Sequence, residues 1–170
     1  MNPTYFGDSY DLVKRFFCEQ LSSLGYTVSI EAMLTGEWAG AEVQFFKLIG
    51  ATPLAAGTES RGGTAVFVDP DTGVQSKATL RHVSLNRFVA LSSQYPIVFA
   101  FDQSFSRQAK FPESLQAKLS ELERLGAHGM YYNSHARFLF VARDIRSLER
   151  LKSHLVGLGL PASRLPTSVI

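Results

Sequence analysis

Aspartates follow two of the apolar runs in this sequence, and their carboxylates are the groups best suited to do chemistry. Asp69 and Asp71 come directly after "TAVFV" (residues 64–68), and Asp102 comes directly after "PIVFAF" (residues 96–101). If both runs are parallel strands, their carboxyl ends meet at one edge of a sheet, where ligands of α/β proteins bind. Carboxylate oxygens are the ligands that Mg²⁺ prefers. The sequence therefore predicts that the three aspartates bind a magnesium ion.

Four further polar side chains near this edge suit phosphoryl chemistry: Ser104, Arg107, His135 and Lys77. Arg107 has the planar fork that fits a phosphate, and we expect Ser104 to contact the same phosphate. His135 follows the strand-like run "GMYY" and is a candidate general base. Lys77 is a candidate for stabilising developing negative charge.

The same residues have a purely structural explanation, which stays open. Asp and Asn favour turns, and "DPDTG" (residues 69–73) is a good turn sequence without any ligand. Asp102 and Ser104 can cap a turn locally, and a histidine in a hairpin turn is often only solvated. The distance between the carboxylates of Asp69 and Asp102 separates the two explanations.

A second candidate region is "YFGDSYDLVKR" (residues 5–15). Gly7 before a helix with Ser9 at its cap can form an anion-binding backbone nest. The simpler interpretation is that the acidic residues of the first turn favour the helix dipole, and that Lys14 and Arg15 lie on a solvated face.

Strands must alternate with helices to position these groups. Apolar positions at helical spacing, Pro and Gly boundaries and capping residues predict five helices, and β-branched or aromatic runs predict the strands. The strand-like runs lack polar alternation, as in buried parallel sheets. We predict an α/β fold, a single Rossmann-like three-layer domain over residues 1–170 with a mostly parallel sheet. The short polar link in "YYNSHARFLF" predicts an antiparallel hairpin near residues 129–142.

The composition is that of a globular protein without a dominant charged surface. The chain has 170 residues, 45% of them hydrophobic, and a formal net charge of +2. This charge does not indicate a dedicated duplex-DNA binder. One cysteine, Cys18, excludes an intrachain disulfide and a zinc site built from thiolates. No apolar run is long enough to span a bilayer, and no signal peptide is recognisable. We therefore expect no membrane association and a cytoplasmic location; the oligomeric state stays open.

Several stretches resemble known groups of proteins. "YFGDSYDLVKR", "VFVDPDTGV", "FDQS" and "SHARFLF" together resemble an uncharacterised group of bacterial and phage-type hypothetical proteins, to which no activity is attached. "VFVDPDTGV" is also similar to the D-x-D-G-T motif of haloacid-dehalogenase-type phosphatases, with Thr72 and Gly73 in reverse order. That resemblance implies Asp69 as nucleophile and Asp71 as acid/base.

Two other motifs are matched in part. Asp69 and Pro70 match the start of the D-P-P-Y motif of amino-methyltransferases, which implies adenosylmethionine as cofactor. "DPDTGVQSK" resembles a restriction-type nuclease core, with Gln75 at the position of its second acid.

The sequence thus favours a metal-dependent phosphoester hydrolase, nuclease-like or phosphatase-like, whose partner is a phosphate-containing ligand or a nucleic acid. The rival hypotheses are a methyltransferase-like or nucleotide-binding domain that uses the same edge, and a non-enzymatic interaction module.

Overall fold

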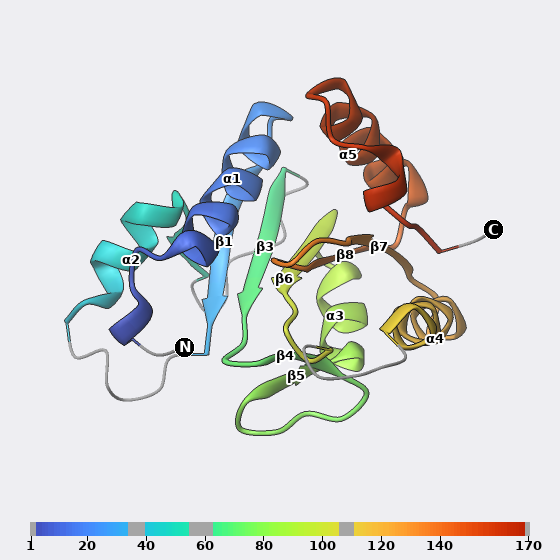
Figure 1. Ribbon diagram of the computed structural model, residues 1–170, viewed down its shortest axis with the longest axis horizontal. Helices are drawn as coiled ribbons and strands as arrows, with labels where there is room; N and C mark the ends of the chain where they lie inside the picture. The colour runs from blue at the N-terminus through green and yellow to red at the C-terminus, as the bar shows by residue number, and fades with distance from the viewer. Residues whose placement is uncertain (1–2, 34–39, 55–62, 106–110, 169–170) are drawn as a thin grey trace.

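A computed structural model describes residues 3–33, 40–54, 63–105 and 111–168 of the chain (Figure 1). Its main sheet has six strands in the order β2-β1-β3-β6-β8-β7. The strands are β1 Thr27–Ala32, β2 Thr52–Pro53, β3 Thr64–Asp69, β6 Ile97–Phe101, β7 His128–Tyr132 and β8 Phe138–Ala142. The α/β fold that the sequence predicts is confirmed.

The sheet is mostly parallel, as predicted. Strands β2, β1, β3 and β6 run parallel to their neighbours, whereas β8 is antiparallel to both β6 and β7. The β7–β8 pair is the predicted hairpin. A separate pair of short parallel strands, β4 Gly73–Gln75 and β5 His82–Ser84, lies beyond the carboxyl end of β3. The sequence patterns predict neither this pair nor β2.

Five α-helices and two short 3-10 helices connect the strands in the described part of the chain. They are α1 Ser9–Ser23, α2 Glu42–Ile49, α3 Leu85–Ser92, α4 Phe111–Arg124 and α5 Ile145–Gly157, with η1 Pro3–Tyr5 and η3 Ala162–Arg164. Ser84 and Asp144 cap α3 and α5, each through a side-chain oxygen that accepts a backbone N–H of the first turn. The prediction that Ser9 caps α1 is wrong. The cap is Asp8, whose carboxylate accepts hydrogen bonds from the backbone N–H groups of Tyr10 and Asp11.

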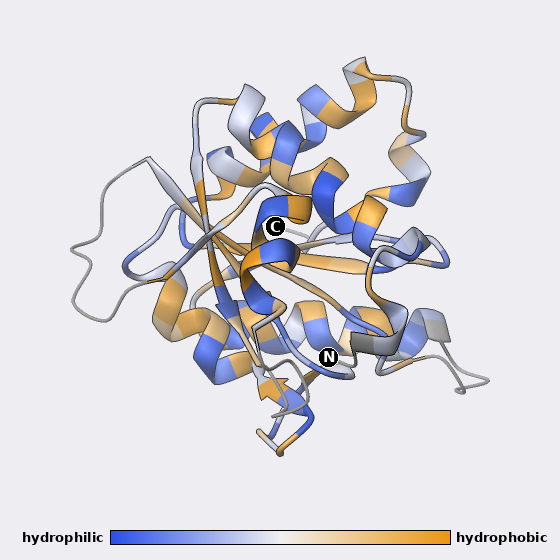
Figure 2. Ribbon diagram, turned by 90° about the vertical axis from the view of Figure 1, so that its left-hand side faces the viewer, coloured by the Kyte–Doolittle hydropathy of each residue, from blue (hydrophilic) through white to orange (hydrophobic). Residues whose placement is uncertain are grey.

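Alternate residues of each strand face opposite layers of helices, because side chains alternate along a strand. Phe67 and Phe99 pack with α1, α2 and α5, and Val66 and Val98 pack with α3 and α4. Figure 2 shows hydrophobic strands between helices that carry both hydrophilic and hydrophobic residues. Within the described ranges, no helix is long and apolar enough to cross a membrane.

Candidate functional site

The carboxyl ends of β1 and β3 form a topological switch point. The helix that follows β1, α2, packs on the same face as α1, whereas β4, β5 and α3, which follow β3, pack on the other face. Adjacent parallel strands whose connections leave to opposite faces open a crevice at their carboxyl ends, and this is where α/β proteins bind ligands.

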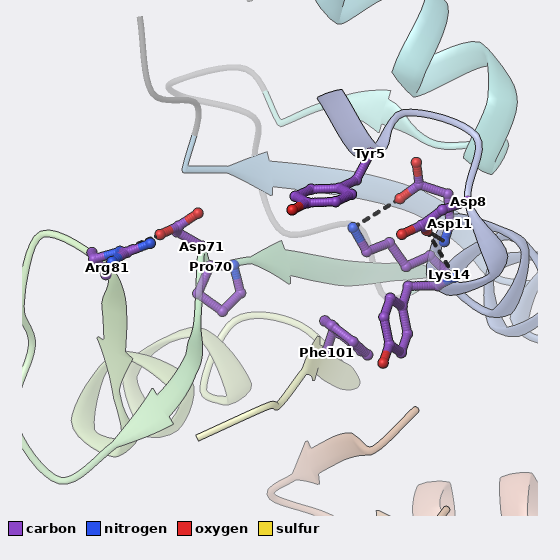
Figure 3. A pocket seen from close by; sticks show the side chains of 9 residues that line it. Tyr5, Asp8, Asp11, Lys14, Pro70, Asp71, Arg81 and Phe101 are labelled. Carbon is purple, nitrogen blue, oxygen red and sulfur yellow. Dashed lines mark hydrogen bonds and ion pairs between the residues drawn. The ribbon is translucent and has the colours of Figure 1, made fainter. Parts of the chain in front are cut away.

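A cleft of about 450 Å³ lies at this point, and we call it the switch-point cleft (Figure 3). Its size is within the range of small-molecule sites. The lining includes three aromatic side chains, Tyr5, Tyr10 and Phe101, together with Pro70. The charged lining consists of Asp8, Asp11, Lys14, Asp71 and Arg81.

Asp11, Lys14 and Asp69 form an ion triad, of which Asp11 and Lys14 line the cleft and Asp69 is buried in contact with Lys14. The Lys14 Nζ lies 3.0 Å from Asp11 Oδ1 and 3.3 Å from Asp69 Oδ1, and all three residues are buried. The ammonium also lies over the rings of Phe45 and Phe101, 5.2 and 5.7 Å from their centroids. Lys14 therefore joins the N-terminal turns of α1 to the end of β3.

Lys14 and Asp11 do not lie on a solvated face of α1, which corrects the expectation from the sequence for Lys14. Together with Cys18 and Leu21 they occupy the buried stripe of the helix, at the spacing i, i+3, i+7, i+10. The sequence does contain a signal for this: Asp11 and Lys14 are charged residues at positions where the amphipathic pattern of the helix calls for apolar ones. The sequence assigns Asp11 to capping, and its carboxylate does accept the Gly7 N–H at 2.9 Å.

The triad holds two carboxylates and one ammonium. Of the two carboxylates, Asp69 is the one whose surroundings favour the protonated form. Burial raises the pKa of the Asp69 carboxyl, and the neighbouring Lys14 only partly opposes this. Burial by itself lowers the pKa of Lys14, but Asp69 and Asp11 outweigh it and hold that pKa above its usual value. Lys14 therefore remains charged.

Asp69 is also poor in hydrogen bonds for so buried a carboxyl. It is 1% exposed, and Oδ1 accepts no hydrogen bond of normal geometry from the described residues despite its proximity to Lys14. Oδ2 has a long contact of 3.5 Å with the same ammonium. Buried polar atoms are normally paired, so an incompletely paired carboxyl beneath a cleft marks a functional candidate.

Asp71 and Arg81 form an ion pair at the rim. Arg81 Nε donates to Asp71 Oδ2 at 2.5 Å, and the Arg81 side chain is 72% exposed. Burial alone would raise the pKa of Asp71, but the hydrogen bond from Arg81 and the positive charges near the carboxylate together outweigh it, so the pKa is lowered. The Thr72 N–H donates to the Arg81 carbonyl and helps to hold this arginine beside the cleft. Its position between β4 and β5 has no counterpart in the sequence patterns.

Asp102 lies on the other face of the sheet, away from Asp69. Its Oδ1 accepts hydrogen bonds from the Val74 N–H at 3.0 Å and from Ser104, through its N–H at 3.1 Å and its hydroxyl at 2.6 Å. Its Oδ2 accepts from Lys118 Nζ at 2.8 Å and from the Tyr131 hydroxyl at 2.9 Å. We call these five residues the Asp102 hub.

The hub connects four parts of the other face. Besides Asp102, the Lys118 ammonium on α4 donates to Ser104 Oγ and to the carbonyl of Val74 in β4. Burial lowers the pKa of Lys118, and Asp102 only partly restores it. Burial raises the pKa of Tyr131, with Asp102 adding to the effect. The ammonium, the carboxylate and the two hydroxyls of the hub are thus paired with one another.

The remaining sequence-predicted residues divide between the two faces. His135 is exposed, and its ring stacks on Tyr10 with centroids 6.2 Å apart, so it lies beside the switch-point cleft. Lys77 and Ser104 instead line a second cavity, of about 490 Å³, next to Lys118. Arg107 lies outside the described residues.

The described residues do not fit one magnesium ion shared by Asp69, Asp71 and Asp102. Asp102 faces the other side of the sheet, and each of the three carboxylates already contacts the ammonium or guanidinium of its own partner. In the described part of the chain, no three His, Cys, Asp or Glu residues are grouped so that they could hold a metal ion.

The fold and the two faces define an α/β protein with a cleft at its switch point. No family model, curated protein or solved structure matches the chain.

Proposed function

We propose that the switch-point cleft is the functional site and that it binds a phosphate ester. The observation that carries the proposal is the convergence of two cations, Lys14 and Arg81, on one cleft at the carboxyl ends of parallel strands. The Arg81 guanidinium is well exposed and pairs with Asp71 through Nε, so it keeps donors toward solvent. A guanidinium is suited to phosphate because its donors match two phosphate oxygens at once.

The acidic residues of the cleft do not prevent an anion from binding, because each is already compensated. Asp8 caps α1, Asp11 accepts from Lys14 and from a backbone N–H, and Asp71 pairs with Arg81. A phosphate at the rim would compete with Asp71 for Arg81. We therefore expect binding that weakens as ionic strength rises.

Hydrolysis of the bound ester is the reaction that the ion triad favours. A water oxygen would bond to phosphorus as the bond to the leaving oxygen breaks, and the proton that the attacking water loses would pass to the leaving oxygen. The fixed charge of Lys14 would stabilise the phosphoryl oxygens, and Asp69 would act as a positioning residue that keeps Lys14 in place. No step of this proposal depends on a metal ion.

Binding is tested by calorimetric titration with AMP, ribose 5-phosphate and inorganic phosphate. Arg81→Gln should weaken the binding of each phosphate compound about tenfold, the loss of one charge-assisted contact. Arg15→Gln is the matched control, because Arg15 is also an arginine in an exposed ion pair, with Glu19, but does not line the cleft. If Arg81→Gln and Arg15→Gln bind the phosphate compounds as tightly as the wild type does, the proposal is contradicted. It is also contradicted if the wild type binds none of the three compounds.

Hydrolysis is tested separately by the release of nitrophenol from p-nitrophenyl phosphate, with and without added Mg²⁺. Turnover should be lost in Lys14→Met and retained in Arg15→Gln. A wild-type protein that binds phosphate esters without turning them over would reject hydrolysis and leave binding intact.

A further inference from the structure

The aromatic side chains of the switch-point cleft form two opposed surfaces. Tyr10 and Phe101 form one of them, with ring centroids 5.0 Å apart and ring planes tilted by 50°, and His135 extends it by stacking on Tyr10. Tyr5 lies across the cleft from Phe101 (Figure 3).

Tyr5 is the least expected member of this arrangement, because its large side chain is 66% exposed. An exposed tyrosine contributes little to folding, since its ring is not removed from water. The same ring is well placed to cover a ligand, because tyrosine offers a rigid flat surface at low conformational cost.

We infer that the cleft seats a nucleobase between Tyr5 and the surface of Tyr10 and Phe101, so that the phosphate ester it binds is a nucleotide. This inference rests on the proposed function, because it assigns the phosphate to Arg81 and adds a site for the ring at the other end of the same ligand. Flat heteroaromatic rings stack on aromatic side chains, and this is how proteins bind bases without pairing them.

The charges of the cleft favour a mononucleotide over a polynucleotide. A nucleic-acid groove needs cations that track successive phosphates. Here Lys14 and Arg81 are the cations among the described lining residues, and three carboxylates accompany them. That set suits the few negative charges of one nucleotide.

The experiment compares the affinity of the wild-type protein for AMP, adenosine and ribose 5-phosphate by calorimetry. AMP should bind at least tenfold more tightly than ribose 5-phosphate, because only AMP carries the base. Tyr5→Ala should remove most of this difference and leave the affinity for ribose 5-phosphate unchanged, whereas Tyr5→Phe should keep it. Leu12→Ala is the control, because Leu12 is an exposed apolar residue of α1 that does not line the cleft.

The outcomes separate this inference from the proposed function. If ribose 5-phosphate binds the wild type as tightly as AMP, the base seat is wrong and phosphate binding stands. If neither binds, both proposals fail. If a single-stranded oligonucleotide binds and AMP does not, the mononucleotide assignment is overturned.

Discussion

Asp69 and Asp102 end neighbouring strands of the same sheet, yet their surroundings are opposites. Asp102 is completely buried and accepts five hydrogen bonds from three other segments and its own turn. Asp69 is as deeply buried, but it contacts one ammonium and has an oxygen without a hydrogen bond from the described residues.

This difference distinguishes a group that builds the scaffold from one that is kept for a site. A saturated buried carboxylate has no capacity for a ligand, and its bonds fix the elements around it. A buried carboxylate with few hydrogen bonds makes folding less favourable, so its presence next to a cleft indicates a role other than stabilising the fold. We therefore interpret Asp102 as a structural residue and propose that Asp69 serves the site.

The largest effect that tests this comparison is expected for Asp102→Ala. The change leaves the Lys118 ammonium and the Tyr131 hydroxyl without their carboxylate partner, and breaking a buried pair costs about 3–5 kcal/mol. Urea denaturation measures the loss. Asp144→Ala, which removes the exposed cap of α5, should cost about 1 kcal/mol. Equal losses in the two variants would mean that the hub does not hold the scaffold together.

The hub should also make Gly73 hard to replace. Its φ of +140° is a conformation that L side chains rarely adopt, and a Cβ there would overlap Asp102 Oδ1 and lie 3.0 Å from two backbone nitrogens. Gly73→Ala should cost about 2–4 kcal/mol, from backbone strain and overpacking together.

Gly126→Ala isolates the strain from the overlap. Gly126 has a φ of +79°, and a Cβ added there would meet nothing within 4 Å, so only the backbone penalty of about 1 kcal/mol applies. If urea denaturation gives both glycine variants the same stability, the hub leaves more room at Gly73 than its packing indicates.

The succession of the longer strands and the helices along the chain was predictable because it depends on local patterns, whereas the strand order in the sheet and the separation of Asp69 from Asp102 were not. Val68 pairs with Ala100, and Asp69 follows the first by one residue whereas Asp102 follows the second by two. Since side chains alternate along a strand, that single residue sends the two carboxylates to opposite faces. Register is a tertiary property, and two- or three-residue strands such as β2 and β4 carry too little pattern to be predicted.

A smaller effect, with a distinctive pH dependence, is expected for Asp69→Asn. Burial in the folded protein raises the pKa of Asp69 above 3.8. The neutral carboxyl therefore contributes fully to the stability of the fold below pH 3.8, and this contribution is lost as pH rises through the raised pKa. Asparagine resembles the neutral acid. The variant should therefore match the wild type in acid and become the more stable of the two as pH rises toward 7, because it avoids the buried charge.

Asp71→Asn is the control of opposite sign. The pKa of Asp71 is lowered, so its contribution is present above 3.8 and is lost as pH falls below that value. This variant should lose stability relative to the wild type near neutral pH and match it in acid. The check is urea denaturation of both variants from pH 3 to pH 8. If the difference in stability from the wild type changes with pH in the same direction for both, Asp69 is not the carboxyl that is destabilised by its buried charge.

The smallest effect on stability is expected for Arg81→Gln, although this variant should weaken the binding of phosphate compounds about tenfold. An exposed ion pair contributes little because water and salt screen it, so its loss should change the free energy of unfolding by less than about 0.5 kcal/mol. Urea denaturation and phosphate-ester titration on the same preparation measure the two effects together. A scaffold residue such as Asp102 changes stability first, whereas Arg81 should change affinity alone. If Arg81→Gln instead unfolds the protein as Asp102→Ala does, the cleft and the hub do not differ in kind, and the Asp71–Arg81 pair would be part of the scaffold.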